Sequence, residues 1–100
     1  MNYNIGRFYV SDRMVRERPE LVSEIFAFLR LVPYRVEHLG YRGVFEYIAK
    51  SPSFPPSDDF CEPPELKLEV VRSGGTGEFE RVSVVDVTGK DWREKEPLSL

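Results

Sequence analysis

The residues that could do chemistry in this chain are few, and their spacing does not predict an enzyme. The chain has one histidine, His38, and one cysteine, Cys61. A nucleophilic cysteine needs a base within hydrogen-bond reach, and no local pattern links these two residues. One cysteine and one histidine are also too few for a structural zinc site. We therefore expect no catalytic residues, no bound metal and no cofactor.

Two further segments invite a ligand-binding interpretation that their composition argues against. Asp58, Asp59 and Glu62 form an acidic cluster, but a calcium loop needs regularly spaced oxygen ligands and a turn glycine, and prolines intervene here. The run SGGTGE at 73–78 lacks the lysine of a phosphate-binding P-loop, and the segment after it resembles a strand. We interpret the cluster as solvated charge and the glycine run as a hairpin turn.

Arginine and aromatic residues on or beside one expected hairpin form the candidate binding site. Arginine beside exposed rings can hold a phosphate and stack a base, and it can equally form a protein–protein hot spot. A competing interpretation places the rings in the core and the arginines in water. The candidate ligand-binding residues are Arg35, His38, Tyr41, Arg42, Tyr47 and, from the loop that follows, Phe54.

One main helix is predicted over residues 19–30, PELVSEIFAFLR. Proline suits a first helical turn, and Glu20 favours the positive end of the helix dipole. The apolar residues at spacing i, i+3, i+4 and i+7 are Val22, Ile25, Phe26 and Leu29. This spacing gives the helix one apolar face to bury against a sheet.

Five segments have the composition or the period-two alternation of strands: 3–10, 31–39, 44–50, 66–71 and 79–87. The last two are expected to form a hairpin. Gly6 is a candidate bulge position, and Pro33 indicates a strand start or an edge because proline cannot donate a ladder hydrogen bond. Residues 11–18 predict a turn or a short helical stretch that Ser11 or Asp12 can cap.

Five of the eight prolines fall in SPSFPPSDDFCEPPE, residues 51–65. The strands on either side could not close a core separately, because two strands alone are marginal in water. This stretch is therefore expected to cross a single domain of residues 1–100 rather than to separate two. Phe54 and Phe60 are poor linker residues, so we expect them to pin an ordered loop. The charged tail from about residue 90 is expected to fray.

Composition and charge exclude several classes of function. The formal charge of −3 is divided between a net +2 in residues 1–50 and a net −5 in residues 51–100. This overall acidity argues against general nucleic-acid binding, which needs a concentrated basic face. No apolar run approaches the ~20 residues of a membrane span. The single Cys61 and the absence of a signal-peptide pattern at the start predict a soluble, cytoplasmic protein.

The segments FEYIAKSPSF and EPPELKLEV resemble a pattern found in small bacteriophage accessory proteins. In that pattern a strand runs into EYxAxSPxF, a proline-bearing loop follows, and PPE precedes the next strand. The matching residues are Glu46, Tyr47, Ile48, Ala49, Ser51, Pro52, Phe54, Pro63, Pro64 and Glu65. Leu66 departs from the pattern by replacing an aromatic residue. The resemblance covers about residues 44–70 and implies a viral origin but no catalytic residues.

These observations predict an α+β fold with an antiparallel sheet of four to five strands and one main helix packed on one face. The expected function is non-catalytic binding: a phage-encoded counter-defence factor that sequesters a small nucleotide immune signal or blocks a host protein. The alternative is a structural or assembly protein that acts through homo-oligomer contacts. The expected partners are a second copy, most simply in a dimer, and a host protein or a small anionic ligand.

Overall fold

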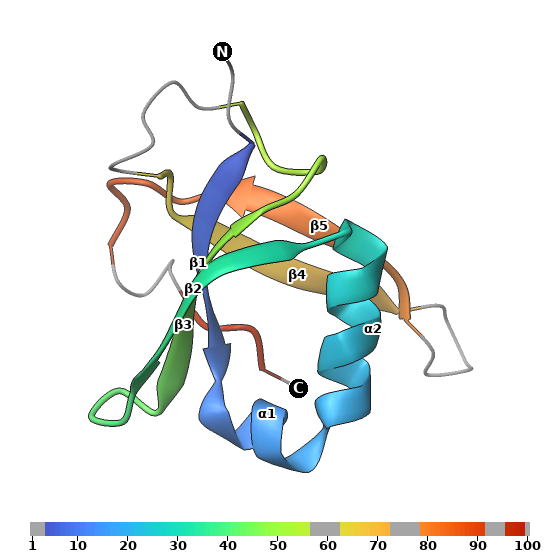
Figure 1. The fold of residues 1–100 in the computed structure, drawn as a ribbon, viewed down its shortest axis with the longest axis vertical. Coiled ribbons are helices and arrows are strands. Elements are labelled where there is room, and N and C mark those ends of the chain that lie inside the picture. The colour runs from blue at the N-terminus through green and yellow to red at the C-terminus, as the bar shows by residue number, and fades with distance from the viewer. Residues whose placement is uncertain (1–3, 57–62, 73–78, 92–95, 100) are drawn as a thin grey trace.

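The computed structural model describes residues 4–56, 63–72, 79–91 and 96–99, and it has an α+β fold (Figure 1). Five strands and two helices alternate irregularly along the described chain. In chain order the elements are β1 (Ile5–Ser11), α1 (Asp12–Glu17), α2 (Pro19–Leu29), β2 (Val32–Leu39), β3 (Val44–Lys50), β4 (Leu66–Arg72) and β5 (Phe79–Asp86).

The main helix, α2, begins at the proline that its sequence places in the first turn. Val22, Ile25 and Leu29 are buried, and Phe26 is partly buried against the same core. A second, shorter helix, α1, precedes it and lies within residues 11–18, for which the sequence predicts a turn or a short helical stretch, so the fold has two short helices. The Ser11 Oγ accepts a hydrogen bond from the Met14 backbone N–H at 3.2 Å, which caps the first turn of α1.

Strands β1, β2 and β3 form an antiparallel sheet in which β3 lies between the other two. The pairing of β1 with β3 continues without a shift from Ile5 to Ser11, so Gly6 is not a bulge. The irregularity lies in β2, where Pro33 pairs with Ala49 and Arg35 pairs with Ile48. Tyr34 is thus an extra residue in the ladder, and the simple alternation along this strand is broken there.

The single sheet of four to five strands that the sequence predicts is divided in two. β4 and β5 pair with each other as a separate antiparallel hairpin. The two sheets meet at one parallel bridge between Arg7 and Glu65, where the Arg7 N–H donates to the Pro64 carbonyl at 2.9 Å. Next along the chain, Leu66 turns into the core over Gly6, at a position where a Cβ atom would overlap it. From Leu66 on, the chain therefore pairs with β5 and does not extend the parallel bridge with β1 into a ladder.

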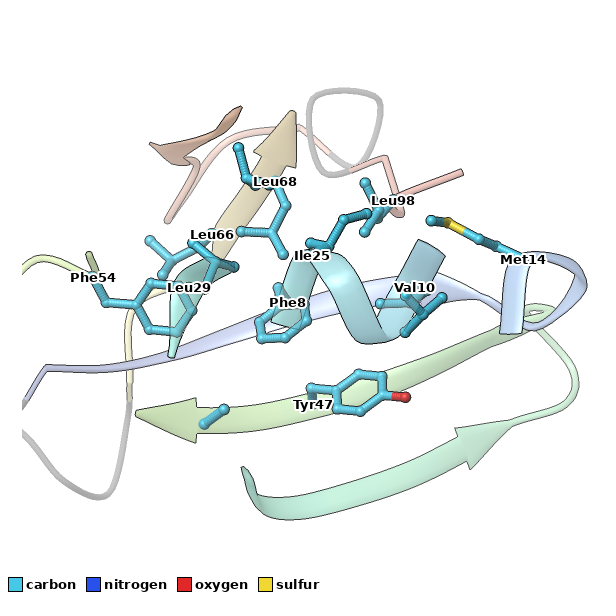
Figure 2. Packing of buried hydrophobic residues seen from close by; sticks show 13 residues of the cluster. Phe8, Val10, Met14, Ile25, Leu29, Tyr47, Phe54, Leu66, Leu68 and Leu98 are labelled. Atoms are coloured by element: carbon cyan, nitrogen blue, oxygen red, sulfur yellow. The ribbon is translucent and has the colours of Figure 1, made fainter. Parts of the chain in front are cut away.

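The core lies between the two sheets and α2 (Figure 2). Its centre is Phe8, whose ring stacks on Tyr47 with centroids 5.2 Å apart and meets Phe26 and Phe54 edge to face. Offset stacking and edge-to-face contacts are the favourable geometries for aromatic pairs. The other members are Val10, Met14, Val22, Ile25, Leu29, Ala49, Leu66, Leu68, Val82 and Leu98.

The chain returns to β1 near its end. The Leu98 N–H donates to the Tyr9 carbonyl at 2.8 Å, and the Leu98 carbonyl accepts from the Ser11 N–H at 2.9 Å. The Leu98 side chain is buried in the core, although it belongs to the tail that the sequence analysis expects to fray. Phe54 is also buried, whereas Phe60 lies outside the described residues. Within the described ranges, neither helix has the length and hydropathy needed to cross a membrane.

Candidate functional site

The six candidate ligand-binding residues do not converge on one site. Two of them, Tyr47 and Phe54, are core residues that contact Phe8. Burial raises the pKa of the Tyr47 phenol, because the apolar surroundings disfavour the phenolate. These two rings stabilise the fold, and their faces are occupied by other aromatic side chains.

The two arginines are held by neighbours on the sheet. The Arg35 guanidinium donates to the Glu37 carboxylate at 2.9 Å, and both side chains are exposed on β2. The Arg42 guanidinium lies over the Tyr9 ring, 4.8 Å from its centroid, which is cation–π geometry. Tyr41, at the tip of the β2–β3 turn, is 86% exposed. Arg35 and Arg42 therefore have separate partners, Glu37 on β2 and Tyr9 on β1.

His38 has the most polar surroundings of the six. Its ring stacks on Phe45 with centroids 4.5 Å apart, and its Nε2 lies 3.5 Å from an Asp12 carboxylate oxygen. The pair is half-exposed, so the contact is a weak surface interaction. Cys61, the nucleophile considered with His38, lies outside the described residues. Among those residues, no group of three His, Cys, Asp or Glu side chains could hold a metal ion.

The most unusual surface of the described chain is strand β2. Seven of its eight residues are exposed, and Leu39 is half-buried. The large apolar side chains at this edge are 53% exposed for Val32, 54% for Tyr34 and 49% for Val36. Phe28, on the last turn of α2, is 47% exposed. We call these four residues the β2 surface.

The β2 surface follows from the order of the strands and from the place where α2 packs. β2 is the last strand of its sheet, and β3 is the one described strand that pairs with it. The buried stripe of α2 packs with residues of β1, β3, β4 and β5 in the core, and β2 lies on the far side of β1 and β3 from the helix (Figure 2). An edge strand of this length with exposed apolar groups is a site for pairing with another chain.

A second candidate site is a polar cleft of about 340 Å³ on the β4–β5 hairpin. Its lining includes Lys67, Glu69, Asp86 and Lys90, and the Lys67 ammonium lies 3.5 Å from the Glu69 carboxylate. Two cations, Lys67 and Lys90, face three carboxylates, those of Glu69, Asp86 and Glu96, so the lining carries a formal charge of −1 and does not favour an anionic ligand. It is the weaker candidate.

No protein-family model, curated protein or solved structure matches this chain. In the sequence, Pro33 indicates a strand start or an edge, but the candidate binding residues chosen there do not include Phe28, Val32, Tyr34 or Val36.

Proposed function

We propose that this protein is a non-catalytic binding protein that contacts another protein chain through the β2 surface. The observation that carries the proposal is the exposure of β2 along its whole length, with three large apolar side chains on it. Exposed apolar groups on an edge strand cost solubility and invite aggregation unless another chain covers them. Pairing at the edge satisfies the backbone groups, and the side chains supply specificity.

A protein partner is favoured over a small nucleotide signal. Nucleotide sequestration needs arginines and rings that converge on one pocket, whereas the Arg35 guanidinium pairs with Glu37 and the Arg42 guanidinium lies over the Tyr9 ring. The β2 surface is an extended strand, which suits a macromolecule better than a small anion. A nucleotide released on denaturing the purified protein and identified by mass spectrometry would instead favour sequestration.

Two occupants of the β2 surface fit this function. One occupant is a host protein, which the chain would block in the host cytoplasm as a counter-defence factor. The resemblance of residues 44–70 to phage accessory proteins favours this occupant. The other is a second copy of the chain, as an assembly protein that acts through homo-oligomer contacts would need. Both act by occupying a surface and neither involves a chemical step.

Site-specific photo-crosslinking in bacterial cells tests the proposal. A benzophenone amino acid is placed at Val36 on β2 and, as a matched control, at Val85 on β5, which is 41% exposed. We expect a covalent adduct with a protein chain from position 36 and not from position 85. Adding Phe28→Asp should abolish the adduct, whereas adding Val85→Asp should leave it.

The mass of the adduct identifies the occupant. Twice the mass of the chain indicates a second copy, and any other mass indicates a host protein; both support the β2 surface as the contact site. Equal adducts from positions 36 and 85, or none from position 36, would contradict the proposal.

A further inference from the structure

The exposed edge of β2 carries a charge pattern that is complementary to itself. Arg35 and Glu37 stand on either side of Val36, and all three are exposed. In an antiparallel pair of identical strands centred on one residue, each neighbour of that residue faces the opposite neighbour in the other strand. Centring the pair on Val36 therefore sets Arg35 of each copy opposite Glu37 of the other.

We propose that the occupant of the β2 surface is a second copy of this chain, paired antiparallel through β2 about a two-fold axis at Val36. This inference depends on the proposed function, because it names the partner of the same surface. The pairing joins two three-stranded sheets into one continuous sheet with the order β1-β3-β2-β2-β3-β1. It is an isologous contact, so it closes on itself and does not propagate into a fibre.

The same register brings two apolar side chains of the β2 surface, those of Tyr34 and Val36, into the contact between the copies. Val36 meets its own copy at the axis, where directly opposed Cβ atoms lie roughly 4.5–5.5 Å apart. Tyr34 comes opposite His38 of the second copy. A two-fold axis perpendicular to the sheet keeps both α2 helices on the same side of the joined sheet.

Pro33 sets the length of the paired segment. In this register Pro33 stands opposite Leu39, and the ladder between the copies extends from Tyr34 to His38. Proline has no N–H to donate, and its place at the end of this ladder leaves the central hydrogen bonds intact. The bulge at Tyr34 is the last position of the ladder, so the added twist of the strand falls at its end.

Charge reversal tests this register without disturbing the core, because both side chains are exposed. The dissociation constant of the dimer is measured by sedimentation equilibrium at low ionic strength for Arg35→Glu, for Glu37→Arg and for the double reversal. Each single change places like charges opposite each other twice per dimer, and we expect about a tenfold or greater loss of affinity. The double reversal restores the attractive pairs and should restore the affinity.

Mixing the two single variants gives the most specific result. One copy then carries two carboxylates at these positions and the other two guanidinium groups, so both cross-strand pairs become attractive. The mixture should form a heterodimer with at least tenfold higher affinity than either variant alone. Lys67→Glu is the matched control, because Lys67 and Glu69 form an equivalent pair two residues apart on β4, and it should leave the dissociation constant unchanged.

Three outcomes would overturn the inference. They are a wild-type chain that stays monomeric at every concentration, single reversals that dimerise as tightly as the wild type, and a double reversal or mixture that fails to recover affinity. If the chain is monomeric and the photo-crosslinker at Val36 still captures a different protein, the proposed function stands and the second-copy inference fails. If position 36 captures nothing, the proposed function itself fails.

Discussion

The Ser51 hydroxyl donates a 2.6 Å hydrogen bond to the carbonyl of Leu29, the last residue of α2. Ser51 follows directly after β3 and is fully buried. The last carbonyls of a helix have no partner within the helix, so this contact satisfies a buried acceptor. The same oxygen accepts from the Ser53 N–H at 3.1 Å, which shapes the turn that carries Phe54 into the core. One hydroxyl thus joins the helix, the sheet and the proline-rich segment.

Removing this hydroxyl should destabilise the fold. Ser51→Ala leaves the Leu29 carbonyl buried without its partner, and we expect a loss of ~1–3 kcal/mol in the free energy of unfolding. Ser53→Ala is the matched control, because its side chain is exposed and only its backbone N–H is used. Urea denaturation of the two variants measures the difference. Equal effects of the two changes would show that the Ser51 contact does not hold the helix end.

A side chain at Gly6 should destabilise the fold. A Cβ atom at this position would overlap the Leu66 side chain and crowd the ring of Phe54. We expect Gly6→Ala to lower the free energy of unfolding by ~1–3 kcal/mol, the usual range for overpacking a core. At Gly40 a Cβ atom would meet only His38 at 3.8 Å, so Gly40→Ala is the control and should change stability little. A Gly6→Ala variant as stable as the wild type would contradict the close approach of β4 to β1.

Arg30 ends α2 in a conformation that favours glycine. Its φ is 52° and its ψ 47°, and the Leu31 N–H reaches back to the Phe26 carbonyl at 3.0 Å, as in a Schellman motif. A left-handed conformation costs an L-residue with a side chain roughly 1–2 kcal/mol. Arg30→Gly should therefore keep or raise the thermal midpoint, whereas Arg30→Val should lower it. A glycine variant that melts below the valine variant would refute this account of the helix end.

Stability should fall at high pH in part through Tyr47. Burial raises the pKa of its phenol above the ordinary value of 10.0, so the unfolded state ionises first as the pH rises. The stabilisation is complete below the unfolded pKa and is lost as the pH rises through the folded pKa. Between about pH 9 and 11, the wild type should lose more stability than Tyr47→Phe, as followed by urea denaturation. Parallel losses in the two proteins would show that Tyr47 does not ionise on unfolding.

Local patterns in the sequence predicted the elements well. The spacing of Val22, Ile25 and Leu29 predicted the face of α2 that is buried, and Ser11 caps α1 as its side chain allows. These features depend on neighbours within a few residues, so a short window of sequence contains the cause.

The division into two sheets and the location of the exposed strand were not predictable in this way. The bridge of Arg7 to Glu65 and the passage of Leu66 over Gly6 join positions more than fifty residues apart. The bulge at Tyr34 depends on how β2 meets β3 and leaves no local signature beyond Pro33. The sequence does not show that Tyr47 and Phe54 belong to the core, because an aromatic side chain is equally suited to stacking a base and to filling a core.

Amide hydrogen exchange tests the central claim, that another chain covers the β2 surface, most directly. Exchange of the amides of residues 34–38 is compared in dilute and concentrated protein, with those of β5 as the reference edge strand. We predict that protection of the outward-facing β2 amides rises with protein concentration, while protection in β5 does not change. Exchange at β2 that is independent of concentration, in a protein that also gives no photo-crosslinked adduct from Val36, would contradict the claim.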